Sequence, residues 1–254
     1  MSPLKSYLYK IFGHLEIYQE IRDLMTPTLE GIDLNGFEGS GLEIGGPSKI
    51  FRKSIPVYKR DNNIDFANFS NQTIWEGEIR NFEPVRYYKK RKGRRLISEA
   101  TELNFKIEKP YDFIISSNCL EHVANPIKAL KRWKNVLKNN GKMILILPNK
   151  KSSFDHLRSI TTIDHLIEDY IKDSGEDDLT HLEEILQLHD LNIDKPAGTF
   201  QQFKVRSLNN FLNRGLHHHV FNEININEML KYSGFNVLNN VTTKIDHIFI
   251  AYKN

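Results

Sequence analysis

The most informative hydrophobic pattern lies in residues 108–150. Two apolar runs, at 113–115 and 143–147, flank a segment in which apolar residues recur at every third or fourth position. This order predicts a strand, a helix and a second strand. Because two parallel strands need a long crossover connection, we expect these elements to form one right-handed unit of a parallel sheet.

Local signals mark both ends of the predicted helix. Asn125 is a favourable N-cap, and Pro126 suits the first helical position because no intrahelical hydrogen bond is lost there. Asn139, Asn140 and Gly141 predict the helix end, since a glycine after the last turn can adopt the left-handed conformation.

Patterns on either side of this unit extend the α/β reading. Residues 1–35 carry an apolar stripe at helical spacing, which we interpret as a helical cap on the sheet, with a dimerisation arm as the alternative. Short apolar runs predict strands at 42–44 and 55–58. The polar segment 165–190 predicts a pair of helices around Ser174 and Gly175.

The end of the chain predicts a helix ending at Gly234 and then two strands, at 236–242 and 247–252. Only residues 243–246 separate these strands, so they must form an antiparallel hairpin. A parallel sheet closed by an antiparallel hairpin is a specific topology.

These elements predict one domain in four parts. They are an N-terminal helical cap (1–36), a cofactor-binding core (37–150), a helical insertion over the acceptor (151–216) and the end of the core (217–254).

Composition places the chain among ordinary globular proteins. Its 254 residues are 39% hydrophobic and carry a net charge of +3, so the overall charge does not indicate a nucleic-acid or membrane partner. A single cysteine, Cys119, excludes an internal disulfide, and no apolar segment suits a signal peptide or a membrane span. We expect a soluble cytoplasmic protein.

One dense basic run, RYYKKRKGRR at 86–95, departs from this average. We interpret it as a solvated loop. The alternative is a phosphate- or RNA-binding segment, because lysine and arginine neutralise phosphate charge.

Candidate binding residues follow the first predicted strands. Gly45 and Gly46 would let the backbone approach a ligand closely at the carboxyl end of a strand. In a nucleotide-binding sheet, an acid after the second strand accepts hydrogen bonds from both ribose hydroxyls. We choose Asp61 for this role, with Asp65 as its competitor.

Taken together, these motifs resemble the class I S-adenosylmethionine-dependent methyltransferases. The resemblance rests on LEIGG at 42–46, Asp61, Glu99-Ala100, YDFIISSNCLEHV at 111–123, VLKNNGKMILILP at 136–148 and the closing hairpin. It implies a Rossmann-like, mostly parallel seven-stranded sheet with an antiparallel C-terminal hairpin strand. The segment from LEHV to Asn149 is most similar to methyltransferases of bacterial surface-polysaccharide biosynthesis.

The resemblance also implies which positions bind S-adenosylmethionine. They are Glu43, Gly45 and Gly46 on the methionine side, Asp61 at the ribose, Glu99 and Ala100 at the adenine, and Asn118, Cys119 and Leu120 beneath the sulfonium. The adjacent glycine pair departs from the alternating glycines of the family.

Two other readings of the sheet fit less well. A nicotinamide dinucleotide fold needs G-x-G-x-x-G at the start of a helix, which the GGPS sequence at 45–48 lacks. A base-flipping nucleic-acid methyltransferase would be expected to have Asn-Pro-Pro-Tyr or a related motif where this chain has SSNC at 116–119.

The predicted reaction is methyl transfer to a small polar acceptor. A hydroxyl of a sugar, a nucleotide-linked sugar or a phosphorylated precursor needs a base to remove its proton, and histidine suits that role. The candidates are His156, His181 and His122, with His189 and His218 behind them.

Two alternatives to this reading remain. Histidines and carboxylates of the insertion could instead bind a divalent metal that assists O-methylation, although no tight ligand pair favours this. The other alternative is a methyltransferase-like binding module without activity.

Overall fold

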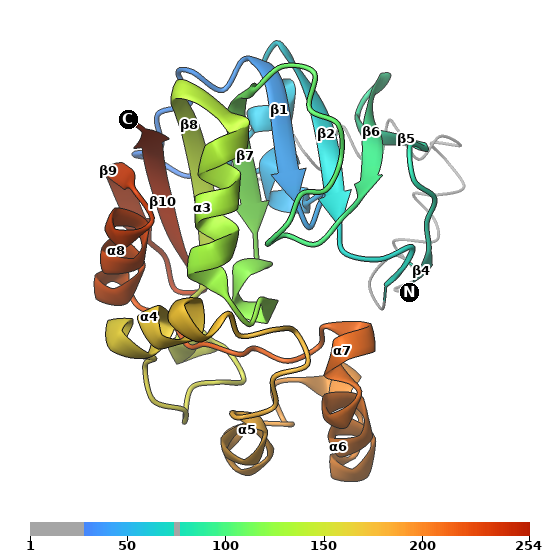
Figure 1. The fold of residues 1–254 in the computed structure, drawn as a ribbon, viewed down its shortest axis with the longest axis vertical. Helices are drawn as coiled ribbons and strands as arrows, with labels where there is room; N and C mark the ends of the chain where they lie inside the picture. The colour runs from blue at the N-terminus through green and yellow to red at the C-terminus, as the bar shows by residue number, and fades with distance from the viewer. Residues whose placement is uncertain (1–27, 74–76) are drawn as a thin grey trace, which may run out of the picture.

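The computed structural model describes residues 28–73 and 77–254 and is built on an eight-stranded mixed sheet (Figure 1). The strand order is β5-β6-β2-β1-β7-β8-β10-β9. In chain order the strands are β1 (Gly39–Ile44), β2 (Asn62–Asn68), β5 (Pro84–Tyr88), β6 (Arg91–Ile97), β7 (Tyr111–Ser117), β8 (Leu137–Pro148), β9 (Phe235–Thr242) and β10 (Asp246–Lys253). A separate two-stranded ribbon pairs β3 (Gln72–Thr73) with β4 (Gly77–Glu78).

The predicted topology is confirmed, with one more strand than expected. Strands β6, β2, β1, β7 and β8 are mutually parallel. Strand β10 runs antiparallel to β8 and forms the expected closing hairpin with β9. The sheet has eight strands rather than seven because β5 adds an antiparallel edge next to β6.

The additional strand comes from the basic run, and our interpretation of residues 86–95 as a solvated loop was wrong. Val85 and Tyr87 are buried, whereas Arg86 between them is exposed, so the segment alternates with the period of a strand. Tyr87 also donates a hydrogen bond to the carbonyl of Asn62. The density of charge hid this alternation in the sequence.

The prediction of the second strand was also wrong. Within residues 55–58, Pro56 interrupts the apolar run, which forms the 3-10 turn η2 (Val57–Lys59). The strand follows it, at Asn62–Asn68, and Asp61 therefore precedes the strand instead of ending it.

The crossover unit has the expected course. Helix α3 (Pro126–Val136) joins the parallel strands β7 and β8, and the Asn125 side chain caps it by accepting a 3.0 Å hydrogen bond from the Lys128 amide. The helix ends at Val136, earlier than predicted, because residues from 137 onward pair in β8. Gly141 thus lies within the strand and does not end the helix.

Two hydrophobic cores lie on opposite faces of the sheet. One packs under α3, α4 (Ile163–Lys172) and α8 (Glu223–Tyr232), and it includes Trp133 and Phe249. The other holds Phe66 and Phe113 together with Tyr58, which comes from η2.

The insertion lies beyond the carboxyl ends of the parallel strands (Figure 1). It contains α4 and α5 (Leu182–Leu188), the two helices predicted around residues 174–175, followed by α6 (Phe200–Leu208) and α7 (Asn210–Asn213). Four short 3-10 turns accompany these elements, at η1 (Lys49–Arg52), η3 (Leu120–His122), η4 (Lys150–Ser152) and η5 (Lys195–Ala197).

The predicted N-terminal cap falls mostly on residues 1–27, which lie outside the described part of the chain. Among the described residues, no helix is long and apolar enough to cross a membrane.

Trp133 connects α3 to the loop that follows β6. Its side chain is fully buried, and the indole Nε1–H donates a 2.9 Å hydrogen bond to the carbonyl of Ala100. We expect Trp133→Phe to lower the free energy of unfolding by about 1–3 kcal/mol from the unsatisfied carbonyl alone. Urea unfolding measures this, and an unchanged midpoint and slope would show that the bond does not hold the loop.

Candidate functional site

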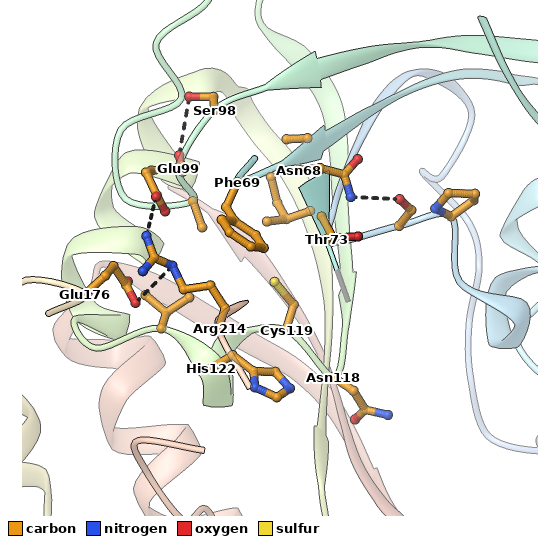
Figure 2. A pocket seen from close by; sticks show the side chains of 17 residues that line it. Asn68, Phe69, Thr73, Ser98, Glu99, Asn118, Cys119, His122, Glu176 and Arg214 are labelled. Atoms are coloured by element: carbon orange, nitrogen blue, oxygen red, sulfur yellow. Dashed lines mark hydrogen bonds and ion pairs between the residues drawn. The ribbon is translucent and has the colours of Figure 1, made fainter. Parts of the chain in front are cut away.

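A cavity of about 300 Å³ opens at the carboxyl ends of the parallel strands (Figure 2). This edge is where open α/β sheets bind ligands. Residues from five parts of the chain line the cavity. They include Gly45 and Gly46 after β1, Asn68 and Phe69 after β2, Glu99 and Ala100 after β6, Asn118, Cys119 and His122 after β7, and Glu176 and Arg214 from the insertion.

The loop after β1 can only be built with glycines. Gly45 has a φ of +82°, and a Cβ atom there would lie 2.9 Å from the Cys119 sulfur. A Cβ atom on Gly46 would collide with the Glu43 carboxylate. The backbone of both residues is therefore exposed to the cavity without side chains, as a close approach to a ligand requires.

Glu43 supports this loop from the other side of the strand. Its buried carboxylate accepts a 2.8 Å hydrogen bond from the Ser48 amide and a short one from the Tyr58 hydroxyl. Burial, followed by the nearby Glu43 charge, raises the pKa of Tyr58 well above its usual value. Glu43 does not line the cavity, and its contacts support the loop that contains Gly45 and Gly46.

Asn68, not Asp61, ends β2 at the cavity. Its Nδ2 lies 3.4 Å from the Gly46 carbonyl, and its Oδ1 accepts a 3.0 Å hydrogen bond from Arg95. Asp61 is exposed at the opposite edge of the sheet, where its carbonyl accepts from the Gly39 amide. Because the strand begins after Asp61, the sequence assignment of this acid to the cavity was wrong.

The competitor acid, Asp65, also lies away from the cavity. It is buried within β2 and accepts hydrogen bonds from the Arg94 guanidinium and the Tyr111 hydroxyl. Arg95 forms a 2.9 Å ion pair with Glu83. Of these two arginines of the basic run, Arg95 is buried, whereas Arg94 pairs with Asp65 from an exposed position.

Arg214 closes the cavity from the insertion. Its guanidinium lies 2.5 Å from Glu99 and 3.6 Å from Glu176, and it sits 5.1 Å from the centre of the Phe69 ring. Figure 2 shows Arg214 between the two carboxylates. Burial outweighs the attraction of Arg214 and raises the pKa of Glu176 to about 7.

Sequence reasoning missed Arg214. Its partner Glu99 is 115 positions away, and no local pattern signals such a pair. Glu99 itself was predicted, and the structure brings it to the cavity together with Ala100.

The turn after β7 forms the floor of the cavity. Asn118 has a φ of +48°, a conformation that Asn tolerates better than most residues. Burial raises the pKa of the Cys119 thiol to about 12, so this side chain is an uncharged wall rather than a nucleophile. Leu120 is completely buried in the hydrophobic core and does not reach the cavity.

His122 is the member of the three predicted bases that lines the cavity. Its Nδ1 lies 2.9 Å from the Leu216 carbonyl, so this nitrogen carries the proton in the neutral ring. Burial, followed by the neighbouring His217, lowers the pKa of His122 well below its usual value. The ring is therefore neutral at physiological pH, with its lone pair on Nε2.

The other predicted histidines lie in the insertion or directly after it. His156 is 3.0 Å from Asp190, and His181 is 2.9 Å from His165. Likewise, His189 is 3.1 Å from Asp194, and His218 is 3.0 Å from the Asn210 side chain. Each is held by a neighbour within the insertion or the segment after it, and none of them lines the cavity.

A buried polar group lies beneath His122. His217 contacts Asp155 at 2.5 Å, and although burial opposes the charge on both groups, this pairing raises the pKa of His217 and, with Arg158, holds that of Asp155 at about 2. Glu121 is also buried, and its Oε2 has no hydrogen-bond partner among the described residues. Burial raises the pKa of Glu121 to about 7.

Comparison with known families gives one match that covers most of the chain. A family model described as a methyltransferase domain matches residues 17–240. In addition, a segment of 63 residues is 40% identical to an uncharacterized protein of Methanocaldococcus jannaschii, a match over 25% of this chain. The chain covers only 27% of that relative's length.

Solved structures of similar fold include two methyltransferases. A putative S-adenosylmethionine-dependent methyltransferase from Listeria monocytogenes has a TM-score of 0.49 and 14% identity, over 87% of this chain and 94% of the other. A second one, from Clostridium acetobutylicum, has a TM-score of 0.46 and 12% identity, over 97% and 99% of the two chains.

The buried carboxyl of Glu121 generates a prediction about pH and stability. Because its pKa is about 7 in the folded protein and 4.5 in the reference state, the folded protein holds a proton that the unfolded chain releases. The free energy of unfolding should therefore fall as the pH rises from about 4.5 to 7, by on the order of 3 kcal/mol for this group. Urea unfolding across this window measures the fall.

In Glu121→Gln the free energy of unfolding should fall less steeply as the pH rises, since the amide does not titrate. Glu176 has a similarly raised pKa, so part of the slope should remain. Glu228→Gln, at an exposed position of α8, is the matched control and should keep the full slope. Equal slopes for both variants would contradict a raised pKa at Glu121.

Proposed function

This chain belongs to the methyltransferase domain family, and we propose that it transfers a methyl group from S-adenosylmethionine to a hydroxyl group of a small polar acceptor. At the level of the family, the predicted methyltransferase class is confirmed, and S-adenosylmethionine as the methyl donor is part of the proposal. The observation that carries the further proposal is the presence of the neutral His122 in the same cavity as Glu99 and Asn118.

The cavity has the features that the cofactor needs. Its volume of about 300 Å³ is at the lower end of the range for small-molecule sites. Gly45 leaves room that a Cβ atom would fill, and Glu176 offers a buried carboxylate oxygen that makes no hydrogen bond among the described residues. When bound, S-adenosylmethionine supplies an electrophilic methyl group on its sulfonium.

We assign the ends of the cofactor by the loops that line the cavity. Gly45 and Gly46 would hold the methionine part, with Asn118 and Cys119 under the sulfonium. Glu99 and Ala100 would hold the adenine, with one Glu99 oxygen already engaged by Arg214. We assign the ribose to Asn68, since this residue ends β2 at the cavity and its amide can donate and accept.

His122 is the proposed general base. Its Nδ1 proton is directed to the Leu216 carbonyl, so Nε2 can accept the proton of an attacking hydroxyl. The lowered pKa keeps the ring unprotonated, and so able to accept a proton, at neutral pH, although it also makes the ring a weaker base. The insertion, through Arg214 and Glu176, covers the cavity and would exclude water from the reaction.

For the acceptor we propose a hydroxyl of a sugar or nucleotide-linked sugar, of the kind found in bacterial surface glycans. The resemblance of residues 120–149 and the polar side chains of the cavity support this class. Arg94 and Arg95 are paired with Asp65 and Glu83, which makes a phosphate-binding role for the basic run the weaker choice.

Asn68→Ala tests the proposed cofactor site. Removing a buried amide from the ribose position should weaken S-adenosylhomocysteine binding by about 1–2 kcal/mol, or five- to thirtyfold in Kd. Titration calorimetry measures this. Asp61→Ala, at the opposite edge of the sheet, is the control and should bind as the unchanged protein does. Weaker binding by Asp61→Ala together with unchanged binding by Asn68→Ala would assign the ribose to Asp61 instead of Asn68.

His122→Gln tests the proposed base. Methyl transfer to an active acceptor should fall by about 10²–10⁴-fold, the range for loss of a general base, while S-adenosylhomocysteine affinity stays within twofold or so. Release of S-adenosylhomocysteine from a panel of sugars and nucleotide sugars measures turnover. His156→Gln, which alters a histidine outside the cavity, should retain activity. A fully active His122→Gln enzyme would exclude this residue as the base.

A further inference from the structure

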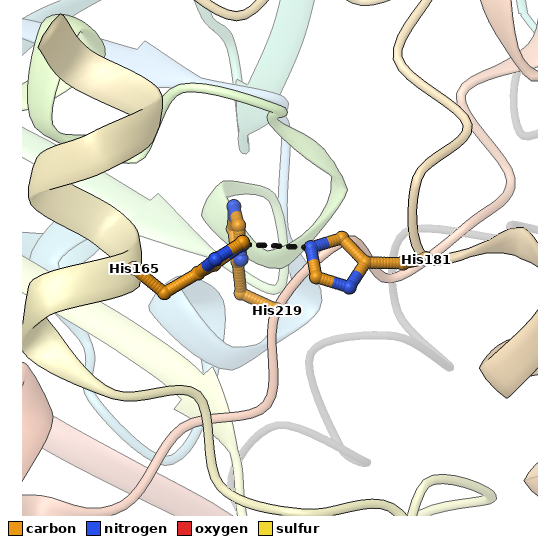
Figure 3. A group of neighbouring side chains, drawn as sticks. All are labelled: His165, His181 and His219. Carbon is orange, nitrogen blue, oxygen red and sulfur yellow. Dashed lines mark hydrogen bonds between the residues drawn. The ribbon is translucent and has the colours of Figure 1, made fainter. Parts of the chain in front are cut away.

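Three histidines from separate segments meet outside the lining of the cavity (Figure 3). His165 lies on α4, His181 directly precedes α5, and His219 lies in the extended segment before α8. One ring nitrogen from each lies within 4.8 Å of the others. No step of the proposed reaction uses these residues.

The hydrogen bonds of His219 leave one nitrogen for a further ligand. The ring is almost fully buried, and its Nε2–H donates to the Ala124 carbonyl at 3.1 Å. Nδ1 therefore carries the lone pair, and among the described residues it has no hydrogen-bond partner. Histidines that bind metals commonly donate their other ring N–H to a carbonyl in this way, which fixes the tautomer.

The contact between His165 and His181 also suits a shared metal ion. Their Nε2 atoms lie 2.9 Å apart, so without an ion one Nε2 carries the ring hydrogen and donates it to the lone pair of the other. Two imidazole nitrogens on one tetrahedral zinc ion, each about 2.0–2.1 Å from the metal, lie about 3.3 Å apart. Small side-chain movements would bring this pair to that separation.

A buried carboxylate balances the charge of an ion at this place. Asp169 is 6% exposed, and its Oδ2 makes no hydrogen bond among the described residues. This oxygen lies 3.3 Å from His165 Nε2 and 3.6 Å from His219 Nε2. An uncompensated carboxylate in a buried site is costly, and a divalent cation would offset that cost.

We propose that His165, His181 and His219 bind one divalent transition-metal ion, with zinc as the best match to a set of three imidazoles. Three protein nitrogens leave a fourth tetrahedral position, which water or the neighbouring Asp169 can occupy. Imidazole ligands select zinc and its neighbours over magnesium or calcium, which prefer oxygen.

The ion would be structural. None of the three histidines lines the cavity. Ala124 separates the two sites, since its carbonyl accepts from His219 while its amide donates to Glu176 in the cavity wall. By joining α4, the start of α5 and the segment before α8, the ion would fasten the insertion that carries Glu176 and Arg214. This inference goes beyond the proposed reaction and does not depend on it.

Cobalt(II) binding tests the proposal. The untagged full-length chain, first dialysed against chelator, should bind one cobalt ion with the strong visible absorption of tetrahedral coordination, and zinc should displace it. His165→Gln and His181→Gln alter side chains that are partly exposed, so both variants should fold. Each should raise the Kd for zinc by at least about tenfold, because even the loss of a residue that only hydrogen-bonds a metal ligand typically costs about that much affinity.

Zinc should also raise the Tm of the unchanged protein and not that of these two variants. His156→Gln, another histidine of the insertion, is the matched control and should bind cobalt normally. Absence of a tetrahedral cobalt spectrum in the unchanged protein would overturn the proposal, as would normal binding by both His165→Gln and His181→Gln. Loss of binding only in His122→Gln would move the ion to the neighbouring Glu121, His122 and His217 group, and would overturn it equally.

Discussion

The ion pair between Arg214 and Glu99 joins the insertion to the sheet, and the candidate site depends on it. Arg214 is 6% exposed, lies 2.5 Å from Glu99 and also faces Glu176 and the Phe69 ring. The Glu99 side chain is 35% exposed, but the guanidinium is buried, so removing Glu99 would leave a buried charge with less compensation, which is destabilising. The cavity is therefore closed by a contact that holds two distant parts of the chain in one arrangement.

The turn at residues 118–125 divides the polar interior into two sites with different chemistry. On one side His122 faces the cavity and is held neutral by burial and by His217. On the other side His219 packs with His165 and His181. The amide and carbonyl of Ala124 bind one group from each site, so a change in the position of the insertion would be transmitted to the cavity wall.

The glycine loop after β1 shows how one buried side chain prepares a binding surface. Both carboxylate oxygens of Glu43 accept hydrogen bonds, one from the Ser48 amide and one from the Tyr58 hydroxyl. The side chain therefore supports the loop and does not line the cavity. Adjacent glycines would then suffice for a close approach of a ligand, because Gly45 has no Cβ to block it and Gly46 gives space to the Glu43 carboxylate. This arrangement gives a physical reason for the departure from alternating glycines.

The sequence by itself determined the features that depend on neighbouring residues. These are the crossover with its Asn125 cap, the closing hairpin, the helices of the first half of the insertion, the glycine turn and the position of Glu99 after a strand. Each follows from periodicity, capping or loop length, which act over a few positions. Only the tertiary structure decided that β2 begins after Asp61, that the basic run pairs as β5 and β6, and that Arg214 meets Glu99. The ion pair joins residues far apart in the chain, and the start of β2 is set by its partners in the sheet, so no local pattern could reveal these two features. The pairing of β5 with β6 is local, but the density of charge hid the alternation of its buried and exposed positions.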